Sequence, residues 1–392
     1  MKANHGFVPY KFQTAGNIIA GPNAITELIP QINLQGNFRH AVIVTQPSLK
    51  AMGVIDRIAD ELKQAGIASR CFTDVKPEPT ITNIREVFGL IAADPVDLLI
   101  GIGGGSVLDA TKLFSVLLTN PVDVRSLVGA DLVSRPGIPT VLIPTTSGTG
   151  SEVTPNSIVT IPEQELKVGI ISRHLLPMLV IIDPVLTVSL PQSITAATGM
   201  DAFTHALESY ISNKANPISD MFALESIRLI AGNLLDAYHE GSHLEARENM
   251  LLGSMYGGMA LSSAGTAAVH ALAYPLGGKF NISHGVANSM LLPHVMAYNM
   301  DAIHGRLGHV ARVMGVHEGS GESTAASESV IRRIYEWTDE MRIPQDLRVF
   351  GVHEADVDDI AVAASKVTRL LHNNPKPMDL NAMKSIYRKL LP

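Results

Sequence analysis

The sequence predicts an α/β domain built on a parallel sheet, followed by a domain made only of helices. In the first half, short apolar runs typical of buried strands alternate with helical patterns of about ten to fifteen residues. After residue 193 no convincing strand pattern follows, and long segments rich in Ala, Leu and Met take over. We place the boundary near residue 188, which gives domains 1–187 and 188–392.

The strands expected in the first half are short and rich in β-branched residues. The run 97–103 (DLLIGIG) is apolar throughout, as expected for a strand covered by helices on both faces. In the helical pattern 55–65, Ile55, Ile58 and Leu62 share one face, and Gly66 follows its end. The expected strands are 40–46, 69–75, 97–103, 140–146 and 178–184, and the expected helices are 55–65, 83–93 and 106–118.

The second half is expected to be entirely helical, whereas residues 147–177 have the weakest pattern of the chain. That stretch holds glycine, proline and polar residues with two short β-like runs, SIVTI and KVGII. The expected helical segments are 194–213, 217–239, 244–264, 266–279, 285–300, 303–315, 323–341, 356–371 and 379–391.

Composition restricts the class of protein. Lys and Arg number 30 against 37 Asp and Glu, a net charge of −7, which argues against nucleic acid as a partner. The chain shows no signal peptide in MKANHGFVPYKFQ and no run of about 18 apolar residues, so we expect no membrane span. The single cysteine, Cys71, excludes an internal disulfide and fits a reducing compartment. We therefore expect a soluble, cytoplasmic protein.

A glycine-rich turn follows the third expected strand and opens a helix. Gly103, Gly104 and Gly105 let backbone N–H groups approach an anion, and the helix N-terminus adds free donors and a positive dipole end. The turn lacks the full dinucleotide fingerprint, because Ser106 replaces the last glycine and no clear acidic residue follows at about 20 residues. It predicts a diphosphate site, and the alternative is a tight strand-to-helix turn with Ser106 as N-cap.

A second loop, residues 144–152, follows the fourth expected strand and is rich in hydrogen-bond donors. It carries five hydroxyl groups and two glycines within nine residues. Because ligands of open parallel sheets bind at the carboxyl ends of strands, this loop and the glycine turn can face one crevice. The alternative is a polar surface loop with ordinary Ser and Thr turn chemistry.

One carboxylate and three histidines form a candidate metal site. Asp201 and His205 lie four residues apart in a helical pattern and so share a face, while His270 and His284 lie in other mostly apolar segments. With 14 histidines and one cysteine, imidazole and carboxylate ligands for Fe²⁺ or Zn²⁺ are favoured over thiolates. The alternative is a set of buried structural histidines. His294 is the next candidate ligand, because it follows His284 closely.

These strings together resemble the iron-containing (group III) alcohol dehydrogenase family. The similarity covers nearly the whole chain, and the combination of motifs is specific. The matching strings are GGGSVLDATK (103–112), PTTSGTGSEVT (144–154), DAFTHALESY (201–210) and HALAYPLGGKFNISHG (270–285), with weaker similarity in IIAGPNAITEL (18–28) and NNPKP (373–377).

The resemblance implies a Rossmann-like dinucleotide-binding domain and a helical metal-binding domain, an architecture shared with dehydroquinate synthase. It implies NAD(P)-dependent interconversion of an alcohol and an aldehyde or ketone, and a homodimer or larger assembly. The implied metal ligands are Asp201, His205, His270 and His284, usually of Fe²⁺ and sometimes of Zn²⁺. The glycine turn and Ser106 are implied to bind the cofactor diphosphate. The other implied cofactor residues are Asp109, Thr145, Thr146, Thr149, Ser151 and Lys167.

Two positions depart from the pattern of the family. Members often carry a second histidine four residues after the third ligand, where this chain has Tyr274. A phenol titrates near 10, so Tyr274 is a poor neutral-pH base, although it can relay a proton, donate a hydrogen bond to substrate or merely line the pocket. The second position is at the end of the strand 40–46, directly after Thr45, where NAD-preferring members commonly carry Asp. Gln46 removes that charge, and strict NAD specificity is therefore not expected.

Other functions remain open at this point. A reductase resembling maleylacetate reductase is the nearest alternative, although such enzymes can dispense with metal and this chain has the full ligand set. A lyase of the dehydroquinate-synthase type would need a basic cluster for a substrate phosphate, which we do not find. A non-catalytic nucleotide-binding or assembly protein would have lost ligands or cofactor loops.

Overall fold

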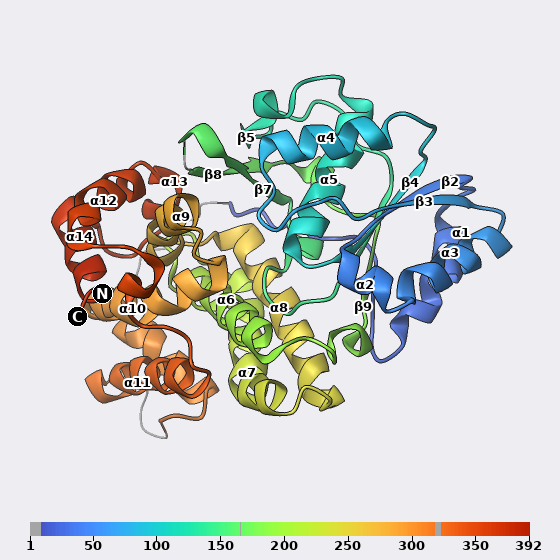
Figure 1. The fold of residues 1–392 in the computed structure, drawn as a ribbon. Helices are drawn as coiled ribbons and strands as arrows, with labels where there is room; N and C mark the ends of the chain where they lie inside the picture. Colours follow the sequence, from blue (N-terminus) through green and yellow to red (C-terminus); the bar gives the residue numbers. More distant parts are fainter. Residues whose placement is uncertain (1–8, 165, 318–322) are drawn as a thin grey trace.

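Six parallel strands form the main sheet of the computed structural model, which describes residues 9–164, 166–317 and 323–392 (Figure 1). The first eight residues, which entered the search for a signal peptide, lie outside the described part. The strand order is β1-β9-β6-β4-β2-β3. The strands are β1 (Ile18–Ala20), β2 (His40–Val44), β3 (Ala68–Phe72), β4 (Leu98–Gly103), β6 (Thr140–Pro144) and β9 (Leu179–Ile182). All the strands expected from apolar runs are present.

Helices cover both faces of this sheet, which explains why its strands are apolar throughout. In β2, Val42 and Val44 point into a core shared with α4 and α5, whereas Ala41 and Ile43 point into a core shared with α1 and α3. The helices of this part are α1 (Leu28–Gln35), α2 (Pro47–Ala51), α3 (Val54–Gln64), α4 (Ile81–Ile91) and α5 (Gly105–Thr119).

A second, three-stranded sheet occupies the region where the sequence pattern is weakest. It has the order β5-β8-β7, and β7 and β8 are antiparallel. The runs SIVTI and KVGII form most of these two strands. The strands are β5 (Gly129–Ala130), β7 (Asn156–Ile161) and β8 (Leu166–Ile171).

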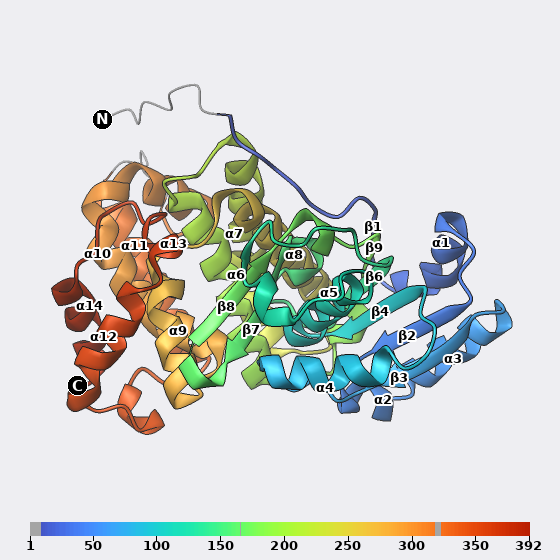
Figure 2. The same cartoon turned by 90° about the horizontal axis from the view of Figure 1, so that it is seen from above.

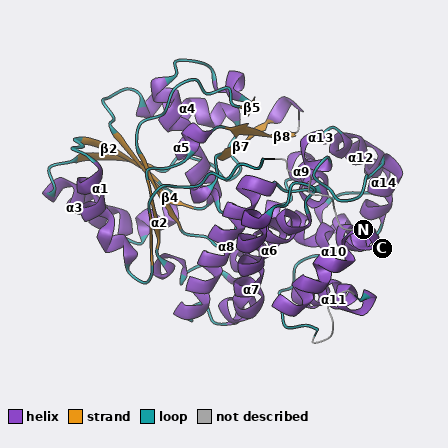
Figure 3. Cartoon of the chain, turned by 180° about the vertical axis from the view of Figure 1, so that it is seen from behind, coloured by secondary structure: helices purple, strands orange, loops and turns teal. Residues whose placement is uncertain are grey.

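The rest of the described chain is helical, and no strand follows β9 there (Figure 3). The segments 285–300 and 303–315 form one helix, because no glycine or proline separates them and Pro293 is accommodated within it. The segment 356–371 is broken instead, since Val367 leaves the helical conformation with φ −81° and ψ 52°. The helices are α6 (Gln192–Ile211), α7 (Pro217–His239), α8 (Leu244–Ala264), α9 (Ala268–Phe280), α10 (His284–Val313), α11 (Thr324–Glu340), α12 (Val357–Ser365), α13 (Thr368–Leu371) and α14 (Leu380–Arg388).

The carboxyl ends of β4 and β6 meet the helical part. Helices α6 and α8 lie between the main sheet and the outer helices α10 to α14 (Figures 1 and 2). The loop after β6 packs on α8 through Gly150 and reaches α6 through the carbonyl of Gly148, which lies 3.2 Å from Nδ1 of His205. The strand order reverses direction beside β2 and β4, where open α/β sheets bind ligands. In the described residues no helix is long and apolar enough to span a membrane.

Candidate active site

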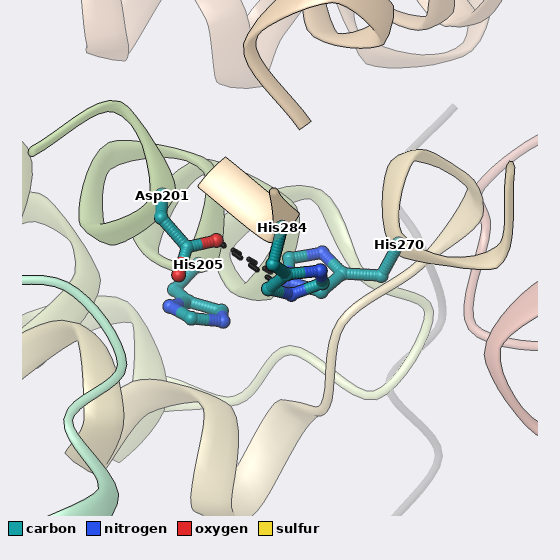
Figure 4. A group of neighbouring side chains, drawn as sticks. All are labelled: Asp201, His205, His270 and His284. Carbon is teal, nitrogen blue, oxygen red and sulfur yellow. Dashed lines mark ion pairs between the residues drawn. The ribbon is translucent and has the colours of Figure 1, made fainter. Parts of the chain in front are cut away.

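Four side chains converge where α6, α9 and α10 meet (Figure 4). One potential ligand atom from each of Asp201, His205, His270 and His284 lies within 4.8 Å of the others. Asp201 and His205 are one turn apart on α6, His270 lies in the first turn of α9, and His284 begins α10. The fold therefore brings together the four side chains that the sequence singled out. His294 lies outside this group, and its Nδ1 is 3.3 Å from the Tyr335 hydroxyl.

Hydrogen bonds fix the tautomers of two of these histidines. Nδ1 of His270 donates to the Glu208 carboxylate at 2.7 Å, and this fully buried carboxylate also accepts from two backbone N–H groups at the start of α9. Nδ1 of His205 donates to the carbonyl of Gly148 at 3.2 Å. With the proton on Nδ1, each Nε2 keeps its lone pair, which is the form that binds a metal.

The site holds more lone pairs than acidic hydrogens, because the pKa values of three of its groups are lowered. Burial lowers the pKa of His205, and lowers that of His284 well below its usual value. Burial raises the pKa of Asp201, but the three imidazoles and the Asn288 amide outweigh this effect and hold the pKa below its usual value. The Asp201 carboxylate is thus charged near pH 7, whereas His205 and His284 are neutral there.

A divalent cation fits this donor set. Nδ2 of Asn288 lies 2.7 Å from Oδ1 of Asp201, 3.2 Å from Nε2 of His270 and 3.3 Å from Nε2 of His284. A side-chain amide has two N–H groups and cannot satisfy three acceptors at once. The cluster therefore has an acceptor that the amide leaves unsatisfied. Imidazole and carboxylate acceptors are ligands suited to Fe²⁺ or Zn²⁺.

Tyr274 lies beside this cluster, one turn after His270 on α9. Its ring centroid is 6.1 Å from that of His284, and the side chain is buried. Burial raises the pKa of the phenol, so Tyr274 is protonated at neutral pH and can donate a hydrogen bond but not act as a base. Its part in catalysis stays a prediction.

The glycine turn and the hydroxyl-rich loop touch each other at the carboxyl ends of β4 and β6. Gly103 ends β4, and Gly105 begins α5. A Cβ atom on Gly105 would lie 2.5 Å from Cγ2 of Thr149, so only glycine leaves the two loops this close. Thr146 lies against Gly104, and the buried Thr145 hydroxyl finds no hydrogen-bond partner within residues 9–164, 166–317 and 323–392. Together they form one surface at the N-terminus of α5.

Several of the expected cofactor side chains are engaged within the protein. The Ser106 hydroxyl accepts a 3.0 Å hydrogen bond from the backbone N–H of Glu78. The Ser151 hydroxyl donates to Asp109, which also pairs with the fully buried Lys112 at 2.9 Å. These contacts join α5 to the loop after β6. The contact of these residues with a cofactor stays a prediction.

Lys167 and Gln46 lie on other elements than the glycine turn and the hydroxyl-rich loop. Nζ of Lys167, on β8, forms a 2.7 Å ion pair with Glu78, and its charge lowers the pKa of His284 behind the larger effects of burial and Asp201. Nζ of Lys167 also lies against Gly277 on α9, the helix that carries His270. Gln46 follows β2 and caps α2, and its side-chain amide donates to the Ser48 hydroxyl at 3.1 Å.

Sequence reasoning missed three residues of this site. Glu208 and Asn288 carried a usable signal, because they lie three residues after His205 and four after His284 on the same helix faces. Glu78 carried none. Glu78 donates its backbone N–H to Ser106 and forms an ion pair with Lys167, and both partners lie far from it in the sequence.

Glu152, in the hydroxyl-rich loop, is expected to make the stability of the chain depend on pH. The side chain is buried, Oε1 has no hydrogen-bond partner in the described part of the chain, and burial raises the pKa from 4.5 to about 7. A folded pKa above the unfolded value means that the stabilisation is complete below about pH 4.5 and is lost as pH rises through about 7. The full loss corresponds to about 3 kcal/mol.

We expect Glu152→Gln, which cannot ionise, to melt at a higher temperature than the wild type at pH 8 and to approach it at pH 5. Thermal unfolding between pH 5 and 8 measures this difference. The exposed Glu163→Gln is the matched control and should follow the wild type. Identical pH dependence in the wild type and Glu152→Gln would disprove the assignment.

Comparison with known proteins agrees with this fold and site. Residues 15–184 match the family model "Iron-containing alcohol dehydrogenase", and residues 195–391 match the model of the C-terminal part of the Fe-containing alcohol dehydrogenase family. Long-chain-alcohol dehydrogenase 1 of Geobacillus thermodenitrificans is 38% identical over 370 residues, which cover 94% of this chain and 93% of the relative.

Solved structures show the same architecture. The crystal structure of 1,3-propanediol oxidoreductase matches with a TM-score of 0.93 and 37% identity, and the match covers 98% of this chain and 100% of that one. Sulfoacetaldehyde reductase from Bifidobacterium kashiwanohense, solved in complex with NAD⁺, matches with a TM-score of 0.87 and 27% identity over 98% of this chain and 99% of that one.

These findings define the chain as an oxidoreductase that acts on CH–OH groups and interconverts alcohols and aldehydes. It belongs to the iron-containing alcohol dehydrogenase family. The expected family and the expected combination of a parallel-sheet part with a helical part are confirmed.

Proposed function

We propose that the enzyme binds Fe²⁺ or Zn²⁺ through Asp201, His205, His270 and His284 and uses NAD(P) as its hydride acceptor and donor. The observation that carries this proposal is the convergence of these four side chains within 4.8 Å, with Nδ1 of His205 and of His270 already engaged by the Gly148 carbonyl and the Glu208 carboxylate. When bound, the ion supplies a Lewis acid that polarises the substrate oxygen and lowers the pKa of an alcohol. The NAD⁺ complex of the sulfoacetaldehyde reductase supports the choice of cofactor.

The residues of the chain bind and orient the reactants. Backbone N–H groups of the turn 103–106, at the positive end of α5, stabilise the cofactor diphosphate. The loop after β6 lies against this turn and so borders the same proposed diphosphate site. Tyr274, protonated beside His284, donates a hydrogen bond to the substrate oxygen or relays its proton. The further proposed cofactor residues are Gln46, Asp109, Thr145, Thr146, Thr149, Ser151 and Lys167.

A steady-state panel tests this function. Protein reconstituted anaerobically with Fe²⁺ or Zn²⁺ is assayed with short alcohols, diols, hydroxy acids and their aldehydes, using both NAD⁺ and NADP⁺. We expect turnover to disappear when the metal is stripped and to return on reconstitution. Full activity of the metal-stripped protein would refute the metal-dependent mechanism.

Gln46 provides a sharper test of the cofactor. It follows β2. A carboxylate at this position would repel the 2′-phosphate of NADPH, and a like charge about 4 Å away costs about 1 kcal/mol or more. We expect Gln46→Asp to lower kcat/KM for NADPH by about tenfold or more, with little change for NADH. Gln46→Asn is the uncharged control. Equal effects of both variants on the two cofactors would place Gln46 away from the 2′ position.

The assembly, the location and the domain boundary are also proposals. A homodimer or larger assembly is supported by the exposed edge of the main sheet, where β1 pairs only with β9 among the described residues. Light scattering measures the assembly.

The single Cys71 supports a reducing, cytoplasmic location, which fractionation of cells checks. The division into 1–187 and 188–392 is supported by the change from strands to helices after β9, and limited proteolysis near residue 188 tests it.

A further inference from the structure

Asn288 is a buried polar residue at the centre of the candidate metal site. It lies on α10 one turn after His284, and its side chain is fully buried. Nδ2 donates to Oδ1 of Asp201 at 2.7 Å, which makes Asn288 a link between α10 and α6. No other hydrogen bond to the Asp201 carboxylate occurs among the described side-chain contacts.

This hydrogen bond engages the carboxylate oxygen that faces the imidazoles. Oδ1 of Asp201 is 3.8 Å from Nε2 of His284 and 4.0 Å from Nε2 of His270 (Figure 4). A carboxylate oxygen has two lone pairs, so it can accept the amide hydrogen on one side and keep the other pair available. The donor from α10 thus restrains the rotation of the carboxylate on α6.

Packing alone does not account for an amide at this position. Oδ1 of Asn288 is buried and has no hydrogen-bond partner among the described residues, and an unpartnered buried acceptor costs about 1–3 kcal/mol. An apolar side chain of similar size would fill the same space without that cost. The benefit that offsets it must come from Nδ2, which faces three of the four proposed ligands.

We propose that Asn288 is a positioning residue of the metal centre, which holds the Asp201 carboxylate turned toward the imidazoles through a hydrogen bond from its side-chain amide. The inference rests on the proposed metal centre. It adds a residue that does not bind the ion itself and acts through a ligand.

Cobalt binding tests this role without any turnover. Apoprotein prepared with a chelator is titrated with Co²⁺, and the visible absorption of the bound ion and a chelator competition give the spectrum and the affinity. We expect Asn288→Leu and Asn288→Ala to weaken Co²⁺ binding by about 10–100-fold and to shift its absorption bands. NADH binding, followed by fluorescence, should stay at the wild-type value in both variants.

The two variants separate the hydrogen bond from packing. Leucine keeps the volume and alanine leaves a cavity, yet both remove the donor, so similar losses of affinity support the proposal. Wild-type affinity and spectrum in either variant would overturn it. Asn299→Leu is the control for folding, because Asn299 is equally buried on α10 and pairs with Asn374 instead, at 2.8 Å. It should bind Co²⁺ normally. Absence of stoichiometric Co²⁺ binding by the wild type would refute the metal centre itself.

Discussion

Replacing His270 by alanine is expected to abolish metal retention and to reduce turnover by about 10³-fold or more. The change removes one of four converging ligands. A Lewis acid contributes several kcal/mol of charge stabilisation, and each 1.36 kcal/mol is about tenfold in rate. The fold should persist, because Glu208 keeps the two backbone N–H groups that it accepts from at the start of α9. Metal analysis, circular dichroism and steady-state kinetics measure the three effects.

His294→Ala is the matched control for this prediction. His294 lies on α10 and is partly buried, with a pKa lowered by burial to about 4, but it contacts Tyr335 rather than the cluster. We expect this variant to retain its metal and its activity. A His270→Ala protein that keeps full metal content, or that turns over normally without metal, would show that the cluster is structural.

The second large effect is expected from Gly150→Ala, in the loop after β6. Gly150 has φ +59°, and a Cβ atom there would lie 2.6 Å from the Cα of Gly258 on α8. Positive φ costs an alanine about 1–2 kcal/mol. The clash with backbone adds about 1–3 kcal/mol, because no side-chain rotation can relieve it. The loop must then move, and it carries Thr149 against Gly105 and the Gly148 carbonyl against His205. We expect a melting temperature lower by several degrees and weaker NADH binding, measured by fluorescence.

Gly53→Ala separates the two causes. Gly53 has φ +75°, but apart from its chain neighbours no described residue has an atom within 4 Å of the position of its Cβ. This variant should therefore show the cost of positive φ alone, with normal NADH binding. Equal destabilisation by Gly53→Ala and Gly150→Ala would mean that the contact between the loop and α8 contributes nothing.

Much of the fold was predictable because burial leaves a local pattern in sequence. Strands of a sheet that is covered on both faces must be apolar throughout, and the run 97–103 showed this directly as β4. The three-stranded sheet was not predictable with the same certainty. Its strand β7 is buried on one face and only partly buried on the other, and β5 has two residues, so neither strand leaves a strong pattern in the sequence.

The sequence by itself determined the chemistry of the site. Helical spacing placed Asp201 and His205 on one face, and the residue types favoured a metal bound by imidazole and carboxylate groups. The tertiary structure decided which groups meet. Glu208 reaches His270 across 62 residues, Asn288 reaches Asp201 across 87, and Lys167 pairs with the distant Glu78. The physical reason is that local periodicity records which side of an element is buried, whereas hydrogen bonds between elements depend on how those buried faces pack together.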